Sequence, residues 1–456
     1  MSRFGWVNLS SSRMVYSILF VAATLAILPI PADGQTATTY SARTDRLLQL
    51  QTPMDPPAVN AVFQDPDFGS NMVRVTDANT NPSSPGLFYR NASVGDQNTW
   101  AVDESKFYVI DQNGQMKFFA FDPLAMQVTP ISNPQIRAEA EFSFADPDLV
   151  YGTSGTKPYV IQSYRFSSGT TTQIFDTNTC GVQPALNPKG TSGTISVSAQ
   201  DERFALVEGG VKSDTHFVVA VYDAALGCEW YNTQTGQVGG QWGTPGAATI
   251  TAPYTIRGGE ISRDGNYVFI LSNAAGGLEY IWQLGTRNVT VCYSHTSHCG
   301  GYEAIGYSDM VNSTGYIDEM NPWKRPLNNI SDTEQLVVPL KTPHGFGMVQ
   351  RWAWTNADPA DSVPVCGTTF EYSYNDVIDG VWDGEIDCIE TDGLASTVWR
   401  FAHNRSAVNE SYFNTQPLGN ISHDGHYYLF TTDWNNLLGI EVSGNPRSDV
   451  FIVQLE

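Results

Sequence analysis

Short runs of alternating apolar and polar residues, each closed by a turn, fill most of the chain after residue 95. The clearest unit reads 260–262, then the turn Arg263-Asp264-Gly265, then a partner run at 267–271. An Asp-Gly pair between two alternating runs predicts a tight β-hairpin. Runs at 278–284 and 288–292 add two strands, so this unit predicts a four-stranded antiparallel sheet.

The same hairpin recurs along the chain. ISRDGNY at residues 261–267 returns as ISHDGHY at 421–427, and weaker copies lie between and before. Self-similarity at roughly 40 to 65 residues is typical of a repeat array, in which each unit buries its faces against its neighbours. The pattern therefore predicts an all-β fold, a seven-bladed β-propeller.

Applying this template to the chain gives seven units, with six or eight as alternatives because the fifth fits poorly. The other predicted strands are 100–102, 107–110 and 117–121; 142–144, 149–151 and 159–164; 195–197, 204–207 and 217–222; a fifth unit from about 302 that includes 336–340; 348–355, 363–368, 385–389 and 398–402; and 419–422, 427–431 and 450–455. The last unit lacks a fourth strand, which residues 72–76 supply by closing the ring.

Composition agrees with short strands and many turns, since 12% of the 456 residues are aromatic, 16% are charged, and 40 are Gly. Arg3 and Arg13 precede an apolar run at 15–30, which predicts an export signal at 1–35, with a membrane anchor as the alternative. A flexible segment at 36–60 and one propeller domain at 61–456 follow. We expect a secreted or periplasmic protein with no membrane span after signal removal.

Six cysteines would then meet an oxidising compartment, where fifteen pairings are open to them. We favour Cys366 with Cys388, which fall on successive predicted strands of one blade. We also favour Cys292 with Cys299, which would clamp one loop.

The formal net charge of −23 is the reverse of what binding to a phosphate backbone requires. We therefore expect no nucleic acid partner. We also expect a monomer that takes a carbohydrate ligand or a protein partner. Sugars are held by stacking on aromatic rings, and many such residues lie between the third and sixth blades. They are Trp230, Tyr231, Trp242, Tyr254, Tyr293, Tyr302, Tyr307 and Trp323. Most of them are expected to pack in the core.

The Ser-x-Asp-Gly-x-Tyr/Phe hairpins resemble the WD40-like repeat of periplasmic TolB-type proteins over most of residues 95–456. The export signal and the runs GEI at 384–386, TDG at 391–393 and VWRFAH at 398–403 are also similar to seven-bladed propellers related to oligogalacturonate lyases. The first resemblance implies a protein-interaction scaffold. The second implies a divalent metal held by histidines at the propeller centre.

The direction of the blades sorts the histidines. If each first strand runs from an upper face to a lower face, the Asp-Gly hairpins lie below and the connections between blades lie above. His423 and His426 then flank a lower hairpin as solvated turn residues. Four others fall in three successive upper connections: His295, His298, His344 and His403. They predict a candidate metal site in one sector of the upper mouth, with ordinary hydrogen-bonded loop histidines as the alternative.

Lyase chemistry needs a base and a cation that stabilises the enolate. The candidate bases are His295, His344 and His403, and the stabilising cation is Arg257, Arg351, Arg400 or a metal. Stacking of Arg351 and Arg400 on nearby tryptophans is the alternative. Asp383, Glu385 and Asp387 share one face of a strand, where a solvated face is favoured over a catalytic carboxylate pair.

The sequence thus leaves three functions open. The first is a secreted propeller that binds a poly- or oligosaccharide at its upper mouth. The second is a metal-assisted polysaccharide (uronide) lyase that uses the four histidines, and the third is a TolB-like protein-interaction scaffold. Whether the chain is an enzyme is not decided by its sequence.

Overall fold

The computed structural model describes residues 39–93, 97–132, 134–182, 195–209, 216–251, 253–272, 278–292, 303–314, 321–332, 334–336, 348–354, 358–370, 380–391, 397–407 and 413–456. Among these residues no helix is long and apolar enough to cross a membrane. The helical segments of this part are two short 3-10 turns, η1 at Thr177–Cys180 and η2 at Phe413–Thr415.

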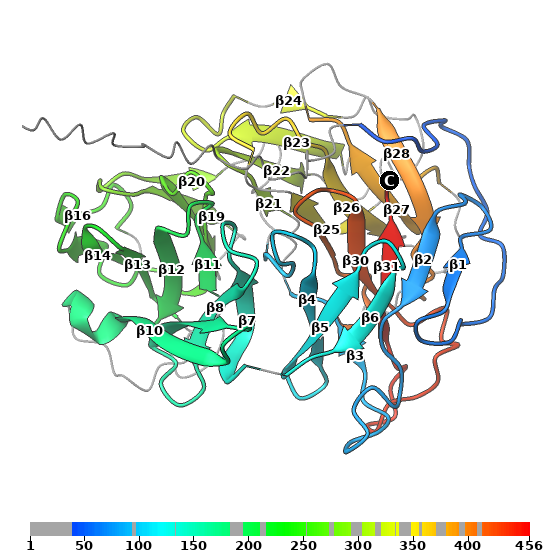
Figure 1. The fold of residues 1–456 in the computed structure, drawn as a ribbon. Coiled ribbons are helices and arrows are strands. Elements are labelled where there is room, and N and C mark those ends of the chain that lie inside the picture. Colours follow the sequence, from blue (N-terminus) through cyan, green and yellow to red (C-terminus); the bar gives the residue numbers. More distant parts are fainter. Residues whose placement is uncertain are drawn as a thin grey trace, which may run out of the picture. The chain divides into compact units, whose positions relative to one another are not determined.

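The described strands form seven antiparallel sheets, the blades, which follow one another around a ring (Figure 1). Blade one holds β3 (Tyr89–Arg90), β4 (Lys106–Asp111), β5 (Met116–Asp122) and β6 (Gln127–Pro130). Blade two holds β7 (Ile136–Phe142), β8 (Leu149–Ser154), β9 (Val160–Arg165) and β10 (Thr170–Asp176). Blade three holds β11 (Ile195–Val197), β12 (Arg203–Glu208), β13 (Val218–Asp223), β14 (Gly227–Asn232), β15 (Gln237–Gly240) and β16 (Gly246–Ala247).

The remaining blades complete the ring. Blade four holds β17 (Ile256–Ile261), β18 (Tyr267–Ser272), β19 (Glu279–Gln283) and β20 (Val289–Cys292). Blade five holds β21 (Ala304–Ile305), β22 (Asp309–Thr314), β23 (Asn321–Pro326) and β24 (Glu334–Gln335). Blade six holds β25 (Met348–Trp354), β26 (Val365–Phe370), β27 (Glu385–Ile389) and β28 (Val398–His403). Blade seven holds β29 (Gly419–Ile421), β30 (Tyr427–Thr432), β31 (Asp449–Gln454), β2 (Asn71–Arg74) and β1 (Val62–Gln64).

The ring closes as the sequence predicts. β2 pairs with β31, so a strand from the start of the propeller completes the blade that its end begins. Val73 lies opposite Ile452 in this pairing, and both side chains are fully buried. Closure in this way protects sheet edges that would otherwise be free. The prediction of seven blades with an N-terminal closing strand is confirmed.

First strands of neighbouring blades contact one another, as β7 does with β11 and β25 with β29, so the first strand of each blade is the inner one. Apolar clusters fill the spaces between blades. One joins Tyr231 of blade three to Trp282 of blade four, and another joins Trp399 of blade six to Phe430 of blade seven. Burial between blades rather than within them is what a repeat array requires.

The repeated Asp-Gly hairpin has a structural role. In blade four the Ser262 hydroxyl donates to Asp264 Oδ1 at 2.5 Å, and the Tyr267 amide donates to Ser262 Oγ at 2.9 Å. Ser422 makes the same two bonds in blade seven. The serine thus bridges the turn and the returning strand, which explains why the motif recurs. His426 is half-buried beside Asp424, whereas His423 is more deeply covered and lies 6.1 Å from the ring of Phe144.

Two disulfides are described in full. Cys366 and Cys388 lie opposite each other on β26 and β27 and are bonded, which confirms that prediction. Cys180, at the end of η1, bonds Cys228 at the start of β14. Cys292 is also disulfide-bonded, but Cys299 lies outside the described residues. Disulfides are compatible with an oxidising compartment, whereas export itself stays a prediction.

Residues 40–68 lie along blade six before they reach blade seven. Arg43 forms a β-bridge with Arg400 of β28, and the Tyr40 ring packs edge-on against Trp399 and Phe401. The Tyr40 hydroxyl donates to the Gly425 carbonyl of blade seven. This N-terminal strap, residues 40–68, covers the outer edge of blade six and then adds β1 to the edge of blade seven.

Candidate functional site

A pocket of about 750 Å³ lies between blades one and two. Most of its lining comes from the β4–β5 turn, the start of β7 and the loop after β8, all on the side opposite the Asp-Gly hairpins. The lining residues are Gly114, Gln115, Met116, Pro134, Gln135, Ile136, Arg137, Ser154, Gly155, Thr156, Gln162 and Thr171. The pocket therefore belongs to the upper face.

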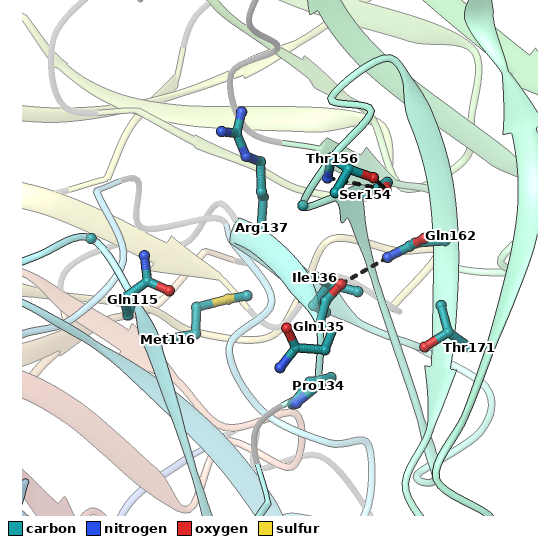
Figure 2. A pocket seen from close by; sticks show the side chains of 12 residues that line it. Gln115, Met116, Pro134, Gln135, Ile136, Arg137, Ser154, Thr156, Gln162 and Thr171 are labelled. Atoms are coloured by element: carbon teal, nitrogen blue, oxygen red, sulfur yellow. Dashed lines mark hydrogen bonds between the residues drawn. The ribbon is translucent and has the colours of Figure 1, made fainter.

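Amides, hydroxyls and one guanidinium dominate this lining (Figure 2). Gln162 Nε2 donates to the Gln135 carbonyl at 3.0 Å, which ties β9 to the entry of β7. The Arg137 side chain is exposed, and its guanidinium makes no hydrogen bond or ion pair with the part of the chain that the structure describes. Its guanidinium projects clear of the other labelled side chains in Figure 2. The pocket thus offers donors and acceptors for hydroxyl groups and one cation for a carboxylate.

Arginines occupy the upper parts of several inner strands. Arg137 is the second residue of β7, and Arg257 is the second residue of β17. Arg351 lies in β25, while its side chain is outside the described residues. Arg257 is half-exposed and lies 3.6 Å from Glu279. Arg90 is likewise the second residue of β3, so the inner strands of blades one, two, four and six each carry an arginine, although the chain as a whole is acidic.

Three of the four predicted metal ligands, His295, His298 and His344, lie outside the described residues. The fourth, His403, is the last residue of β28 and is fully buried under the N-terminal strap. Its Nε2 lies 3.1 Å from the Gln49 carbonyl oxygen, and its ring is edge-on to Phe68. Burial lowers the pKa of His403.

Arg400 is also fully buried and forms a bidentate pair with Glu385. Its Nε and Nη2 donate to the Glu385 oxygens at 2.7 and 2.6 Å, and its guanidinium lies over the Phe68 ring. Burial opposes the charge of Arg400, but the Glu385 contacts outweigh it and raise its pKa. Arg400 therefore has an aromatic and a carboxylate partner, but the ring is that of Phe68 in the strap and not one of the tryptophans expected from the sequence.

The solvated face expected for Asp383, Glu385 and Asp387 is wrong, because all three side chains are buried. The strap covers this part of blade six, so their charges are withdrawn from water. Burial raises the pKa of Glu385 to about 7 even beside Arg400. Asp387, buried near Glu385, has its pKa raised well above the usual range.

Two features of the site were missed by reasoning from the sequence. The upper pocket was not found, although an arginine near the start of an inner strand was a signal for it. Asp65 and Asp67 were also missed, and they lie beside His403. Among the aromatics proposed for sugar stacking, Trp230, Tyr231 and Tyr254 pack in the core as expected.

Fold and pocket together define a seven-bladed β-propeller with a polar cavity on its upper face. Two solved structures share this fold over nearly the whole chain. An oligogalacturonate lyase in complex with manganese has a TM-score of 0.53 at 12% identity, covering 91% of this chain and 98% of that one. An oligogalacturonate lyase from Vibrio parahaemolyticus has a TM-score of 0.51 at 9% identity, covering 87% and 96%.

No protein-family model and no curated protein matches the chain. The predicted resemblance to oligogalacturonate lyase propellers is thus borne out in fold. At 9–12% identity the likeness carries the architecture alone.

Proposed function

We propose that this propeller binds an acidic oligosaccharide at its upper face, in the pocket between blades one and two. The observation that carries the proposal is the combination of an exposed Arg137, whose guanidinium pairs with none of the described residues, with amide and hydroxyl side chains around one cavity. Hydroxyl-rich ligands need such paired donors and acceptors, and a guanidinium binds a carboxylate through two parallel hydrogen bonds. A uronic acid unit presents both kinds of group.

The protein's charge sets a limit on this binding. A net charge of −23 repels a polyanion over distances up to about one Debye length, roughly 8–10 Å at physiological salt. Short oligouronides are therefore favoured over long polymers, since each added carboxylate beyond the pocket meets the acidic surface.

A metal-assisted uronide lyase is the second candidate, favoured by the fold shared with two lyases over most of the chain. Its catalytic groups would be His344 and Arg351, with His295 and His298 as metal ligands. His403 and Arg400 belonged to the same hypothesis, but both are buried under the strap, so neither reaches a substrate in this structure. Manganese is a property of the first lyase, and for this chain it is part of the hypothesis.

Calorimetric titration with galacturonate oligomers, and with neutral galactose oligomers for comparison, tests the binding proposal. Arg137→Met should weaken oligouronide binding at least tenfold and leave the fold intact. Arg165→Met removes an arginine from β9 of the same blade and should leave the affinity unchanged. Equal affinities for wild type and Arg137→Met would overturn the proposal.

Absorbance of unsaturated uronide products tests the second candidate in the same samples. Product formation that is lost in His344→Ala would establish the lyase. Binding without product across a panel of uronic acid polymers would reject it and leave the binding function.

A further inference from the structure

Three potential metal ligands meet at the outer rim between blades six and seven, away from the upper pocket. Asp65 and Asp67 lie in the turn that joins β1 to β2, and His403 ends β28. One ligand atom from each lies within 4.8 Å of the other two. Two ligands on opposite sides of one ion at about 2.2 Å lie about 4.4 Å apart, so the spacing suits a shared ion.

The hydrogen bonding of His403 leaves one ring nitrogen facing a carboxylate. Nε2 lies 3.1 Å from the Gln49 carbonyl oxygen, which only accepts, so Nε2 carries a proton and donates it. In the neutral ring Nδ1 then carries a lone pair and can only accept. It lies 3.1 Å from Asp67 Oδ2 but has no hydrogen-bond partner in the part of the chain that the structure describes, and the side chain is 0% exposed. Two acceptors facing each other in a buried place call for a shared cation, and an ion about 2.2 Å from each would lie to one side of the line that joins them, as it does between two adjacent ligands.

The surrounding bonds orient the three side chains. Thr52 donates to both oxygens of Asp67, from its hydroxyl at 2.6 Å and from its amide at 2.9 Å. Asp65 accepts the amides of Asp67 and His403 at 2.9 and 3.3 Å. A histidine that donates its far nitrogen to a backbone carbonyl, beside carboxylates fixed by hydrogen bonds, is the usual outer arrangement of a metal site.

Two guanidinium groups lie beside the cluster. Arg405 Nη2 is 3.3 Å from Asp65 Oδ2 and offsets one of the two carboxylate charges. Arg43 donates to the Asp67 carbonyl, but its own charge is paired with Asp45 at 2.9 Å. One net negative charge therefore remains for a divalent ion.

We propose that Asp65, Asp67 and His403 bind a divalent transition-metal cation that fastens the N-terminal strap to blade six. Two carboxylates with one imidazole favour Zn²⁺ or Mn²⁺ over Ca²⁺, which takes oxygen ligands. The site holds the turn between β1 and β2 against the end of β28, across more than 330 residues of sequence. It is independent of the proposed carbohydrate site.

Calorimetry and thermal melting with Zn²⁺, after chelation and desalting of the full chain, test the proposal. Wild type and a His295→Ala/His298→Ala variant should both bind Zn²⁺ at this site and gain several degrees in Tm, since the ligand binds only the folded state. Asp67→Asn should lose that Zn²⁺ and the gain. Ca²⁺ at the same concentration should produce neither effect.

Thr52→Ala keeps all three ligands and removes one bond that orients Asp67, so it stays informative if Asp67→Asn folds poorly. We expect it to weaken Zn²⁺ binding about 10- to 100-fold. His426→Gln is the matched control, because it changes a histidine paired with a carboxylate elsewhere, and it should bind Zn²⁺ as wild type does. A Zn²⁺ response that is absent from wild type would leave a direct imidazolium–carboxylate pair as the account of the His403–Asp67 contact. A response that is unchanged in both Asp67→Asn and Thr52→Ala would show that Zn²⁺ binds elsewhere, and either result would overturn the proposal.

Discussion

The guanidinium of Arg263, in the hairpin of blade four, pairs with the carboxylate of Glu141 in β7 of blade two, and both side chains are buried. The pair passes the end of blade three, where Glu141 also accepts the Val197 amide at 2.7 Å. Arg263 lies over the Phe144 ring, 4.8 Å from its centroid. A residue of the repeated hairpin thus ties three blades together.

Removing one partner of this pair should destabilise the fold strongly. Arg263→Met leaves the Glu141 carboxylate buried without its cation, which costs about 3–5 kcal/mol. The free energy of unfolding in urea measures the loss. The double variant Arg263→Met/Glu141→Gln should recover part of it, because no buried charge then remains. Arg165, paired with Asp146 on the surface of blade two, is the control, and its change to Met should cost less than about 1 kcal/mol.

Asp361 should be a second strong contributor to stability. Its buried carboxylate accepts the amides of Tyr307, Ser308 and Asp309 at 2.5–2.8 Å and so joins blade six to the first hairpin of blade five. Asp361→Ala leaves three donors unsatisfied and should cost about 2–4 kcal/mol. Asp361→Asn keeps one acceptor oxygen, so its free energy of unfolding should lie between those of wild type and Asp361→Ala. Thermal melting ranks the three proteins, and equal Tm values for the two variants would contradict this reading.

Local pattern predicted most of the blades, because an Asp-Gly turn between alternating runs specifies a hairpin without distant partners. The cysteine pair of blade six followed from the same layout, since Cys366 and Cys388 fell on neighbouring strands. In blade one the alternation of apolar and polar residues did not locate the inner strand. Its inner strand is at Tyr89–Arg90, and Trp100, which the sequence favoured, forms only an isolated bridge with Phe107.

The surroundings of blade six could not be predicted because they depend on contacts remote in sequence. Glu385 and Asp387 alternate as a solvated face would, yet residues of the strap cover them. His403 meets Gln49 across a separation of 354 residues, and no local signal marks that contact. The upper pocket is similar, because its lining comes from two blades and only Arg137 hinted at it.

The two described disulfides should differ in what they contribute. In the chain-entropy account a bond that closes a longer loop restrains the unfolded chain more. Cys180–Cys228 closes 48 residues and Cys366–Cys388 closes 22, so paired Cys→Ala variants should lose about 4 and about 3 kcal/mol, respectively. Urea unfolding of each double variant checks the order. A larger loss for the blade-six pair would point to packing between β26 and β27 instead.

Glu104 should make the protein less stable as pH rises. It lies beside the blade-seven hairpin, where its carboxyl accepts the Asp424 amide at 3.0 Å. Burial, then the charge of Asp424, raises its pKa from the usual 4.5 to about 9. His426, bound to Asp424, and Asp103 also face this group. The folded protein therefore keeps a proton that the unfolded chain releases between those values, so stability falls with pH across that window.

Glu104→Gln keeps the acceptor and cannot ionise, so its Tm advantage over wild type should grow from pH 5 to about pH 8. Glu202→Gln changes an exposed carboxylate and should show no such growth. A Glu104→Gln advantage that is constant with pH would show that the carboxyl is already ionised in the folded state.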